Sequence, residues 1–303
     1  MIRTWPVPEE LSGERCDVSL ARLTGLSRAV CAQYIDEKRV TINNKVALKS
    51  ARLNFADVLE IDLPDPDLAD NEPYVELPIV YTDDDVVVVD KPAGVAAHPS
   101  QGWSGPTVTG SLVKMGHVLT SHGPDERKGI VHRLDVGTSG LMVVAKSERA
   151  YLSIKDQFRD RTVEKLYHTL IQGRLDPSSG TIDAPIDRHP NSSYRFAVIS
   201  DGRPSITHYD TLESFAYASL LAVHLETGRT HQIRVHMSAL RHPCCGDLTY
   251  GADPTLAAKL KLDRQWLHAV KLGFTHPGNG EYISFTSPYA PELTRALDLA
   301  RSL

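Results

Sequence analysis

The sequence lacks the features that mark secreted and membrane-spanning proteins. It has only four cysteines in 303 residues, and no stretch approaches the roughly 20 apolar residues needed to cross a bilayer. Its first residues, MIRTWPVPEE, contain no apolar segment typical of a secretory signal. We therefore expect a cytoplasmic protein whose cysteines are reduced thiols, namely Cys16, Cys31, Cys244 and Cys245.

Several motifs of well-known enzyme chemistry are also missing. The sequence has no GxxxxGK phosphate loop, no GxGxxG after a predicted strand and no GxSxG turn, so nucleotide-driven chemistry and serine hydrolysis have no support. Cys244 and Cys245 are adjacent, which is not the spacing of a zinc knuckle. Because His231, His236 and His242 match no standard zinc pattern, we expect no metal site.

The net charge of −5 argues mildly against a nucleic-acid-binding protein, because phosphates attract Lys and Arg. The charge is unevenly distributed along the chain, however. Residues 15–52 carry eight basic and three acidic side chains, whereas residues 57–76 carry eight acidic side chains and no basic one. A basic module is therefore followed by an acidic connector.

The basic module predicts two short helices and a hairpin. Residues 19–23 have a helical pattern that Gly25 ends, and Ser27 can cap a second helix that runs to about Lys38. A hairpin is expected over residues 40–46, because the Asn43-Asn44 pair tolerates the positive φ angles of a tight turn.

A segment rich in Pro and Asp, PDPDLADNEPYVELP at residues 64–78, follows a further strand predicted at residues 58–63. Proline restricts its neighbours and the acidic side chains repel one another. An ordinary surface loop fits this composition as well, but the change in the sign of the charge favours a linker. We predict a small domain over residues 1–66, a linker over residues 67–78 and a larger domain over residues 79–303.

The larger domain mixes strands and helices without a regular βαβ repeat. Strands are expected over residues 86–89, 141–145, 165–171 and 219–225, and helices over residues 152–158 and 230–240. From this alternation we predict an α+β fold with a mostly antiparallel mixed sheet, preceded by a small α+β module.

The segment HRLDVGTSG, residues 132–140, is the first candidate site. Asp135 lies beside two potential cations, His132 and Arg133, and precedes a glycine-bounded turn whose backbone can approach a ligand closely. A carboxylate on such a turn can face a cleft and act as a nucleophile. An Asp beside an Arg in a loop is more often a solvated pair, so this segment alone does not define a site.

The segment ETGRTHQIRVHM, residues 226–237, is the second candidate. If a helix begins at Thr230, His231 and Arg234 share one of its faces. Arg234 has apolar neighbours, and a half-buried Arg needs a carboxylate partner. Asp135 is a candidate for that partner.

The segment VEKLYHTL, residues 163–170, is the third candidate. On a strand, Lys165 and Tyr167 point to the same face, where a Tyr beside a Lys can stack on a base. A Tyr at the edge of the core with its hydroxyl in water fits the pattern at least as well. A weaker candidate, DKPAGVAAHPS at residues 90–100, either lines a pocket with Lys91 and His98 or simply connects two strands.

Taken in this order, the four segments resemble the RluA/RluC/RluD family of pseudouridine synthases, over about residues 79–290. HRLDVGTSG is similar to the family's catalytic motif, with Asp135 in the position of the essential Asp. VEKLYHTL is similar to the K-x-Y motif and puts Tyr167 in the position of the active-site tyrosine. GRTHQIRVHM is similar to the third motif, with Arg234 as the partner of the Asp. Four motifs in one order are far more specific than any one of them.

The basic module resembles an S4 RNA-binding domain, which accompanies the RluC and RluD branches. This chain has Lys38-Arg39 and Asn44 where S4 domains commonly have glycine, and Ala56-Asp57 where they have Gly-Asp. A solvated basic face is the alternative interpretation. The resemblance implies a phosphate-binding face made of Arg15, Arg28, Lys38, Arg39 and Lys45.

The resemblance also implies a mechanism. The target uridine leaves its stack, and Asp135 acts at the ribose, either by attacking C1′ or by removing the C2′ proton. The N1–C1′ bond breaks, the uracil turns, and C5 bonds to C1′. Arg234 would keep Asp135 ionised, Tyr167 would stack on the base, and Arg133 would fill the gap left in the RNA. No redox change or hydrolysis occurs, so no cofactor is expected.

We therefore predict an RNA pseudouridine synthase whose partner is structured RNA, large-subunit ribosomal RNA in the first place and tRNA as the alternative. A non-catalytic rRNA-binding or ribosome-assembly protein is a competing prediction, which the intact HRLD sequence disfavours. A glycosidase would need a second carboxylate that the motifs do not clearly offer. We expect a monomer without a membrane partner, because no apolar heptad or stripe is evident.

Overall fold

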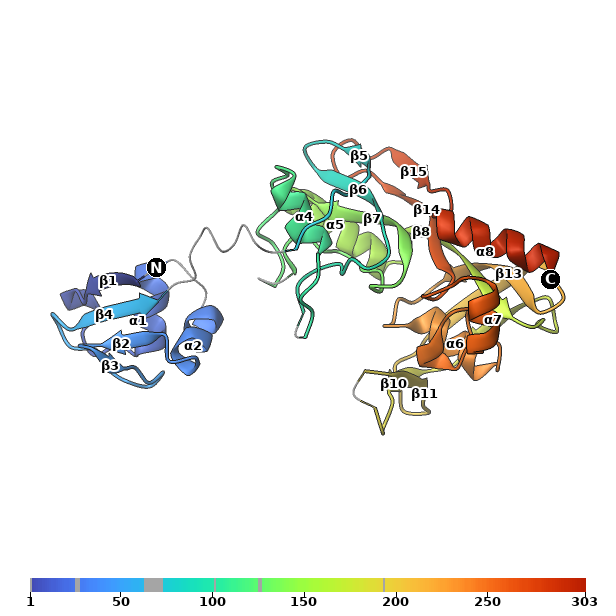
Figure 1. The fold of residues 1–303 in the computed structure, drawn as a ribbon. Helices are drawn as coiled ribbons and strands as arrows, with labels where there is room; N and C mark the ends of the chain where they lie inside the picture. Colours follow the sequence, from blue (N-terminus) through green and yellow to red (C-terminus); the bar gives the residue numbers. More distant parts are fainter. Residues whose placement is uncertain (1, 25–27, 63–72, 101, 125–126, 193) are drawn as a thin grey trace. The chain divides into compact units, whose positions relative to one another are not determined.

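The computed structural model describes all residues except 1, 25–27, 63–72, 101, 125–126 and 193, and the chain forms two compact units, Met1–Glu72 and Pro73–Leu303 (Figure 1). The predicted end of the first domain at residue 66 lies outside the described residues. Residues 73–78 were predicted as linker but belong to the larger unit, because Leu77 is buried in its core and Val75 packs against that core. Among the described residues, no helix has both the length and the apolar character needed to cross a membrane.

In its described residues, the N-terminal unit is a four-stranded sheet in the order β1-β4-β2-β3 with helices α1 and α2. Its apolar core includes Leu20, Leu53 and Leu59, all fully buried. The predicted hairpin is confirmed, since Asn43 and Asn44 have φ angles of 50° and 64°. The elements are β1 (Ile2–Pro6), η1 (Glu9–Leu11), α1 (Cys16–Thr24), α2 (Arg28–Asp36), β2 (Val40–Ile42), β3 (Lys45–Val46) and β4 (Val58–Asp62).

One unpredicted strand and three predicted positions in this unit need comment. Strand β1 was not predicted, because its mostly exposed residues show no apolar alternation. It forms by pairing with β4 along its whole length. The predicted helix stop Gly25, the predicted cap Ser27 and the strand end at Leu63 lie outside the described residues.

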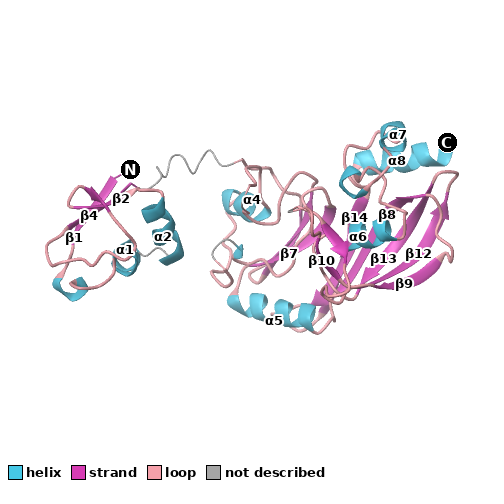
Figure 2. Cartoon of the chain, turned by 90° about the horizontal axis from the view of Figure 1, so that it is seen from below, coloured by secondary structure: helices cyan, strands magenta, loops and turns pink. Residues whose placement is uncertain are grey.

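The larger unit contains a nine-stranded sheet in the order β5-β6-β7-β14-β8-β13-β12-β9, with β15 paired to β14. Figure 2 shows β14, β8, β13, β12 and β9 of this sheet side by side. All these strand pairs are antiparallel except β7–β14, so the predicted α+β fold with a mostly antiparallel sheet is confirmed. The strands are β5 (Ile79–Thr82), β6 (Val86–Lys91), β7 (Ser139–Ala145), β8 (Glu164–Gln172), β9 (Ser179–Asp183), β12 (Ile206–Ser214), β13 (Ala218–Leu225), β14 (Leu267–Thr275) and β15 (Tyr282–Thr286).

Helices cover both faces of this sheet, which explains the unbroken apolar runs in β6 and β7. Val87 and Val89 face the core that contains Leu112 of α4 (Val108–Lys114). Val86 and Val88 face the opposite core, which contains Ile154 of α5 (Glu148–Arg159). A strand buried on both sides needs apolar residues at every position rather than at alternate ones.

The remaining elements gather around β8, β12 and β13. They are the small hairpin β10 (Ile186–Arg188) and β11 (Phe196–Val198), helix α6 (Gln232–Ala239), the turn η3 (Leu248–Tyr250), and helices α7 (Pro254–Lys259) and α8 (Pro291–Ser302). Two predicted helix starts were wrong. Helix α5 begins at Glu148 because the Ser147 side chain caps it, and α6 begins at Gln232 because His231 is left-handed, with φ 58°.

The two halves of the sheet meet at a narrow parallel contact. Only two residue pairs join β7 to β14, Ser139 with His268 and Gly140 with Ala269. Gly140 has φ 111°, and a Cβ there would overlap the backbone of Ala269, so only glycine allows this approach. The turn that carries Asp135 leads directly into this junction.

Candidate active site

A cleft of about 520 Å³ opens where the halves of the sheet meet. It is bordered by residues 131–138, by the end of α5, by β8 and by the segment 225–234 that leads into α6. Four residues predicted from the sequence line it together: Arg133, Asp135, Tyr167 and Arg234. Three segments far apart in the sequence thus contribute to one cavity.

Asp135 and Arg234 are in direct contact. The Arg234 Nη1 donates to Asp135 Oδ2 at 3.2 Å. The same guanidinium donates two shorter hydrogen bonds to Asp247, from Nε to Oδ2 at 2.6 Å and from Nη2 to Oδ1 at 3.0 Å. Asp247 is the stronger partner and was not predicted. The two-pronged geometry fixes the guanidinium and leaves one edge of it for Asp135.

Burial determines how these charges behave. Burial alone would lower the pKa of Arg234, but the hydrogen bonds and charges of Asp247 and Asp135 raise it above its usual value. The ring of Tyr250 covers the guanidinium, with its centroid 4.8 Å from Cζ. Arg234 is therefore a permanent cation beside Asp135.

Tyr167 and Lys165 lie on β8 and both line the cleft. Tyr167 is buried, and burial, together with the charge of Asp135, raises its pKa. Burial and the charge of Arg161 lower the pKa of Lys165, whose ammonium lies 5.7 Å from the ring centroid of Phe158. The wall of the cleft thus combines aromatic surface with positive charge, which suits a base and its phosphates.

The two predicted cations beside Asp135 differ from each other. His132 was predicted as a potential cation, and this was wrong: burial lowers its pKa to about 3. Its Nε2 accepts a hydrogen bond from the Val143 N–H at 2.9 Å, and its ring stacks on Phe158. Arg133, in contrast, is exposed at the cleft and makes no ion pair with any described residue.

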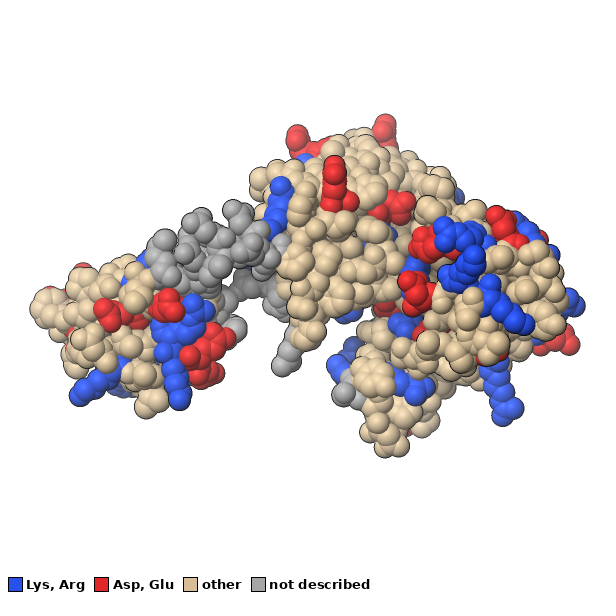
Figure 3. Space-filling view, in the orientation of Figure 1, with Lys and Arg blue, Asp and Glu red and all other residues tan. Residues whose placement is uncertain are grey.

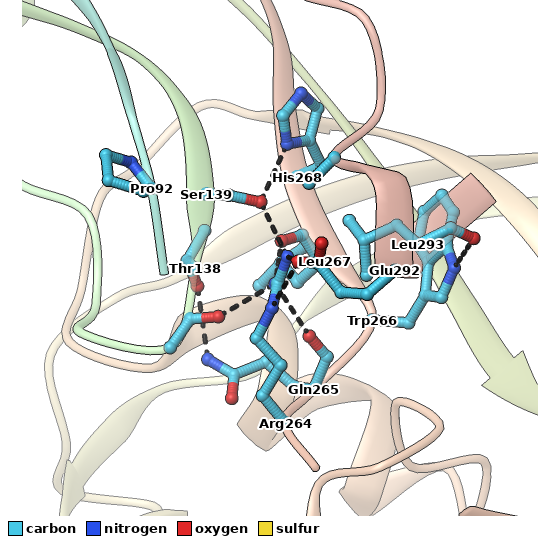
Figure 4. Close-up of polar contacts among 12 residues, drawn as sticks. Pro92, Thr138, Ser139, Arg264, Gln265, Trp266, Leu267, His268, Glu292 and Leu293 are labelled. Atoms are coloured by element: carbon cyan, nitrogen blue, oxygen red, sulfur yellow. Dashed lines mark hydrogen bonds and ion pairs between the residues drawn. The ribbon is translucent and has the colours of Figure 1, made fainter. Parts of the chain in front are cut away.

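The turn after Asp135 is held by a network of polar contacts from the segment that precedes β14 (Figure 4). Arg264 donates to the Gly137 carbonyl and to Ser139 Oγ, both at 2.9 Å, and pairs with Glu292 in the first turn of α8. Gln265 Nε2 donates to Thr138 Oγ1 at 3.3 Å. These contacts restrict the backbone that carries Asp135.

The loop DKPAGVAAHPS supports the same turn from the other side. Lys91 is fully buried and does not line the cleft. Its Nζ donates to the carbonyls of Pro92 at 3.0 Å and Val95 at 2.8 Å, with a longer contact to Val136 at 3.4 Å. Burial lowers its pKa to about 7. Lys91 and His98 therefore do not line the cleft. The segment does not connect two strands either, because it leads from β6 to α4.

The candidate metal ligands have other partners. His231 Nδ1 contacts the Tyr250 hydroxyl at 2.8 Å. His236 contacts Thr207 Oγ1 and the Ala184 carbonyl, and His242 contacts the Gln172 carbonyl. Within the described residues, no group of three His, Cys, Asp or Glu side chains has the geometry to hold a metal. All four cysteines are free and buried.

The predicted phosphate-binding residues of the N-terminal unit are mostly paired with carboxylates. Arg15 and Arg28 both bind Asp17, at 2.9 and 2.8 Å. Arg39 lies 3.5 Å from Asp62 and stacks on Tyr34. Lys38 and Lys45 are exposed and form no ion pair with a described residue. Figure 3 accordingly shows basic and acidic side chains interspersed on the visible face of this unit.

Comparison with known proteins places this site in a family. Residues 85–239 match the RNA pseudouridylate synthase family. A protein from Mycobacterium bovis named as an uncharacterised RNA pseudouridine synthase is 58% identical over 302 residues, covering 99% of this chain and 98% of that protein. The Ribosomal large subunit pseudouridine synthase D of Nitrosomonas europaea is 38% identical, over 98% of this chain and 87% of that protein.

A solved structure agrees. Human RNA Pseudouridylate Synthase Domain Containing 1 has 29% sequence identity and a TM-score of 0.58, covering 78% of this chain and 90% of that one. The matched region contains Asp135 and Arg234, which meet in the cleft. The chain therefore belongs to the RNA pseudouridylate synthase family and is an RNA pseudouridine synthase, an isomerase.

Proposed function

We propose that Asp135 is the carboxylate that acts on uridine in this enzyme and that the target uridine lies in large-subunit ribosomal RNA. The position of Asp135 supports its proposed catalytic role. Its side chain is 15% exposed in the cleft and accepts a hydrogen bond from Arg234. A carboxylate that lies beside a fixed cation and is open to a ligand is equipped to attack C1′ or to remove the C2′ proton. The second part rests on the relatives named for the large ribosomal subunit.

Tyr167 is proposed as the surface on which the uracil stacks. It lies on the wall of the cleft and its hydroxyl stays protonated because burial raises its pKa. A cavity of about 520 Å³ has the size of a small-molecule site, so it suits a single nucleotide that has left its stack. Arg234 has the proposed role of keeping Asp135 ionised.

Arg133 is proposed to fill the gap that the flipped uridine leaves in the RNA. It is exposed at the cleft directly beside the catalytic turn. Replacing Arg133 by Ala should slow turnover of folded RNA about tenfold or more, but should slow turnover of a short single-stranded substrate much less, because that substrate needs no flipping. Equal loss on both substrates would contradict the role.

The N-terminal unit is proposed as an S4-like RNA-binding domain. Of the five residues predicted to bind phosphate, Lys38 and Lys45 are exposed and form no ion pair with a described residue, whereas Arg15, Arg28 and Arg39 contact carboxylates. Charge reversal at Lys38 and Lys45 should therefore weaken RNA binding and reduce its salt dependence. A solvated basic face would predict no change in either quantity.

The deciding experiment follows tritium released from C5 of uridine in labelled ribosomal RNA, with no nucleotide or metal added. Release by the wild type and none by Asp135→Asn would support both the reaction and its carboxylate. Release from tRNA but not from ribosomal RNA would overturn the proposed target alone. No release from naked RNA or assembling subunits, with RNA binding intact, would favour a non-catalytic role in ribosome assembly.

A further inference from the structure

His231 has an unusual backbone at the edge of the cleft. It precedes α6 and has φ 58° and ψ 19°, the left-handed region. Residues other than glycine adopt this region rarely, and such residues cluster at functional sites. The imidazole lines the cleft, and its Nε2 lies 3.9 Å from Asp135 Oδ2. The unfavourable backbone therefore holds an imidazole beside the carboxylate.

The hydrogen bonds around His231 favour a proton on one of its two ring nitrogens. The Tyr250 hydroxyl accepts from the Phe196 N–H at 3.0 Å, so its own proton is available to His231 Nδ1 at 2.8 Å. Nδ1 is then an acceptor, and in the neutral ring the proton lies on Nε2. Edge contacts with Phe196 and Tyr250, at 5.7 and 5.6 Å between centroids, fix the ring.

The charge state agrees with a neutral donor. Burial lowers the pKa of His231; the carboxylates of Asp135 and Asp247 oppose this, and the cations Arg234 and Arg133 add to it. The outcome is a pKa below the usual value. At neutral pH the cleft thus receives an N–H donor that is neutral and fixed in direction.

We propose, on the basis of the function proposed above, that His231 Nε2–H donates to the O2 carbonyl of the flipped uracil and stabilises the base when the N1–C1′ bond breaks. The electron pair of that bond goes to the base and is shared between O2 and O4. The pair returns to form the C5–C1′ bond, which displaces the Asp135 carboxylate from C1′ or, in the alternative route, is accompanied by return of the proton to C2′. C5 then releases its proton to water and N1 takes one up, so the product is neutral. A fixed donor aimed at a developing negative charge accelerates such a step.

The position of the donor selects O2 over O4. Asp135 has to reach C1′ or C2′ of the ribose, and O2 is attached to the carbon next to N1, close to the ribose. O4 is on the far side of the ring. A donor 3.9 Å from the Asp135 carboxylate therefore lies on the O2 side of the base.

Two substitutions of His231 distinguish a hydrogen-bond donor to the uracil from a residue that only supports the structure of the cleft. His231→Phe keeps a ring for the contacts with Phe196 and Tyr250 but removes the donor. His231→Asn keeps an N–H donor and tolerates the left-handed backbone. We expect His231→Phe to lower kcat about 100-fold with unchanged RNA binding, and His231→Asn to recover much of that loss.

His242→Phe is the matched control. His242 bonds the Gln172 carbonyl through Nδ1 and does not line the cleft, so this variant should keep the wild-type kcat. Tritium release from ribosomal RNA gives the rate, and filter binding gives the affinity. If His231→Phe and wild type have the same kcat, or if both His231 variants lose RNA binding equally, the proposal is overturned.

The ¹⁵N spectrum of the imidazoles provides a readout that does not depend on activity. In the free wild-type protein at pH 7.5, His231 should be neutral with its proton on Nε2, and Tyr250→Phe should reduce that preference. A proton on Nδ1 would overturn the proposal. If the wild type releases no tritium, the proposed function fails first; a fully active His231→Phe leaves that function intact and overturns only the role of His231.

Discussion

Each unit of this protein contains an aspartate bound by arginine, and the two sites have opposite stoichiometry. In the N-terminal unit one carboxylate, Asp17, is shared by two arginines whose side chains are 47% and 61% exposed. In the catalytic unit one buried arginine, Arg234, is shared by two carboxylates. Asp17 is buried and fully partnered, whereas Asp135 receives one hydrogen bond and faces a cleft.

The difference between these two sites shows that an Asp–Arg pair can either serve as a structural contact or leave the Asp available for reaction. The pKa of Asp17 is lowered because the hydrogen bonds from Arg28 and Arg15 outweigh the effect of burial. Its oxygens are occupied by these donors. Asp247 takes the two strongest hydrogen bonds of Arg234, so Asp135 keeps the benefit of the positive charge while remaining open to the substrate.

The largest expected effect comes from replacing the two aspartates in parallel. Asp135→Asn should abolish tritium release, by at least about 10⁴-fold, with little change in melting temperature. Asp17→Asn should lower the free energy of unfolding by about 1–2 kcal/mol and leave kcat near the wild-type value. Loss of activity in Asp17→Asn without unfolding would contradict the contrast between the two sites.

The next largest effect, on stability and on kcat, is expected from Asp247, which accepts two hydrogen bonds from Arg234. Asp247→Ala leaves a buried arginine with half its partners, which costs about 3–5 kcal/mol and should also lower kcat as Arg234 shifts. Asp298→Ala removes an exposed partner of Arg301 and should cost under about 0.5 kcal/mol. Urea unfolding of both variants measures this, and similar costs would show that Asp247 is not essential to the pair.

A smaller effect is expected from the turn that carries Asp135. Ser139→Ala removes the hydroxyl that contacts Arg264 and His268. Ser219→Ala removes an equally buried hydroxyl that contacts the Gly173 carbonyl, away from the cleft. Both should lose about 1 kcal/mol of stability, but only Ser139→Ala should lower kcat, about tenfold and without weaker RNA binding. Equal kcat values would mean that the network supports folding alone.

The last expected effect is a change of stability with pH. The pKa of His132 is about 3 in the folded protein and about 6.5 in the unfolded chain. Above pH 6.5 both states are neutral; below it the unfolded state binds a proton that the folded state does not, so stability is lost as the pH falls. Melting temperature should therefore drop more between pH 7.5 and 5.0 for wild type than for His132→Gln. Equal drops would indicate that His132 titrates in the folded protein.

Local patterns in the sequence predicted the fold class, and the resemblance to the family predicted four residues that line the cleft, Arg133, Asp135, Tyr167 and Arg234. The positive φ of Asn43 and Asn44 follows from residue type, and the apolar run 86–89 has the composition of a doubly buried strand. Helix starts were less accurate, because a left-handed residue such as His231 looks like any other before the structure is known.

The short motifs that contain Asp135, Tyr167 and Arg234 occur in the order found in one enzyme family, and this order by itself predicted that the three residues belong to one active site. Only the tertiary structure decided which partners they have. Asp247 lies 13 residues after Arg234 and 112 after Asp135, and nothing in its local sequence, CCGDLTY, marks it as the partner of Arg234. Hydrogen-bond partners depend on contacts between distant segments, and these exist only once the two halves of the sheet have joined at Gly140.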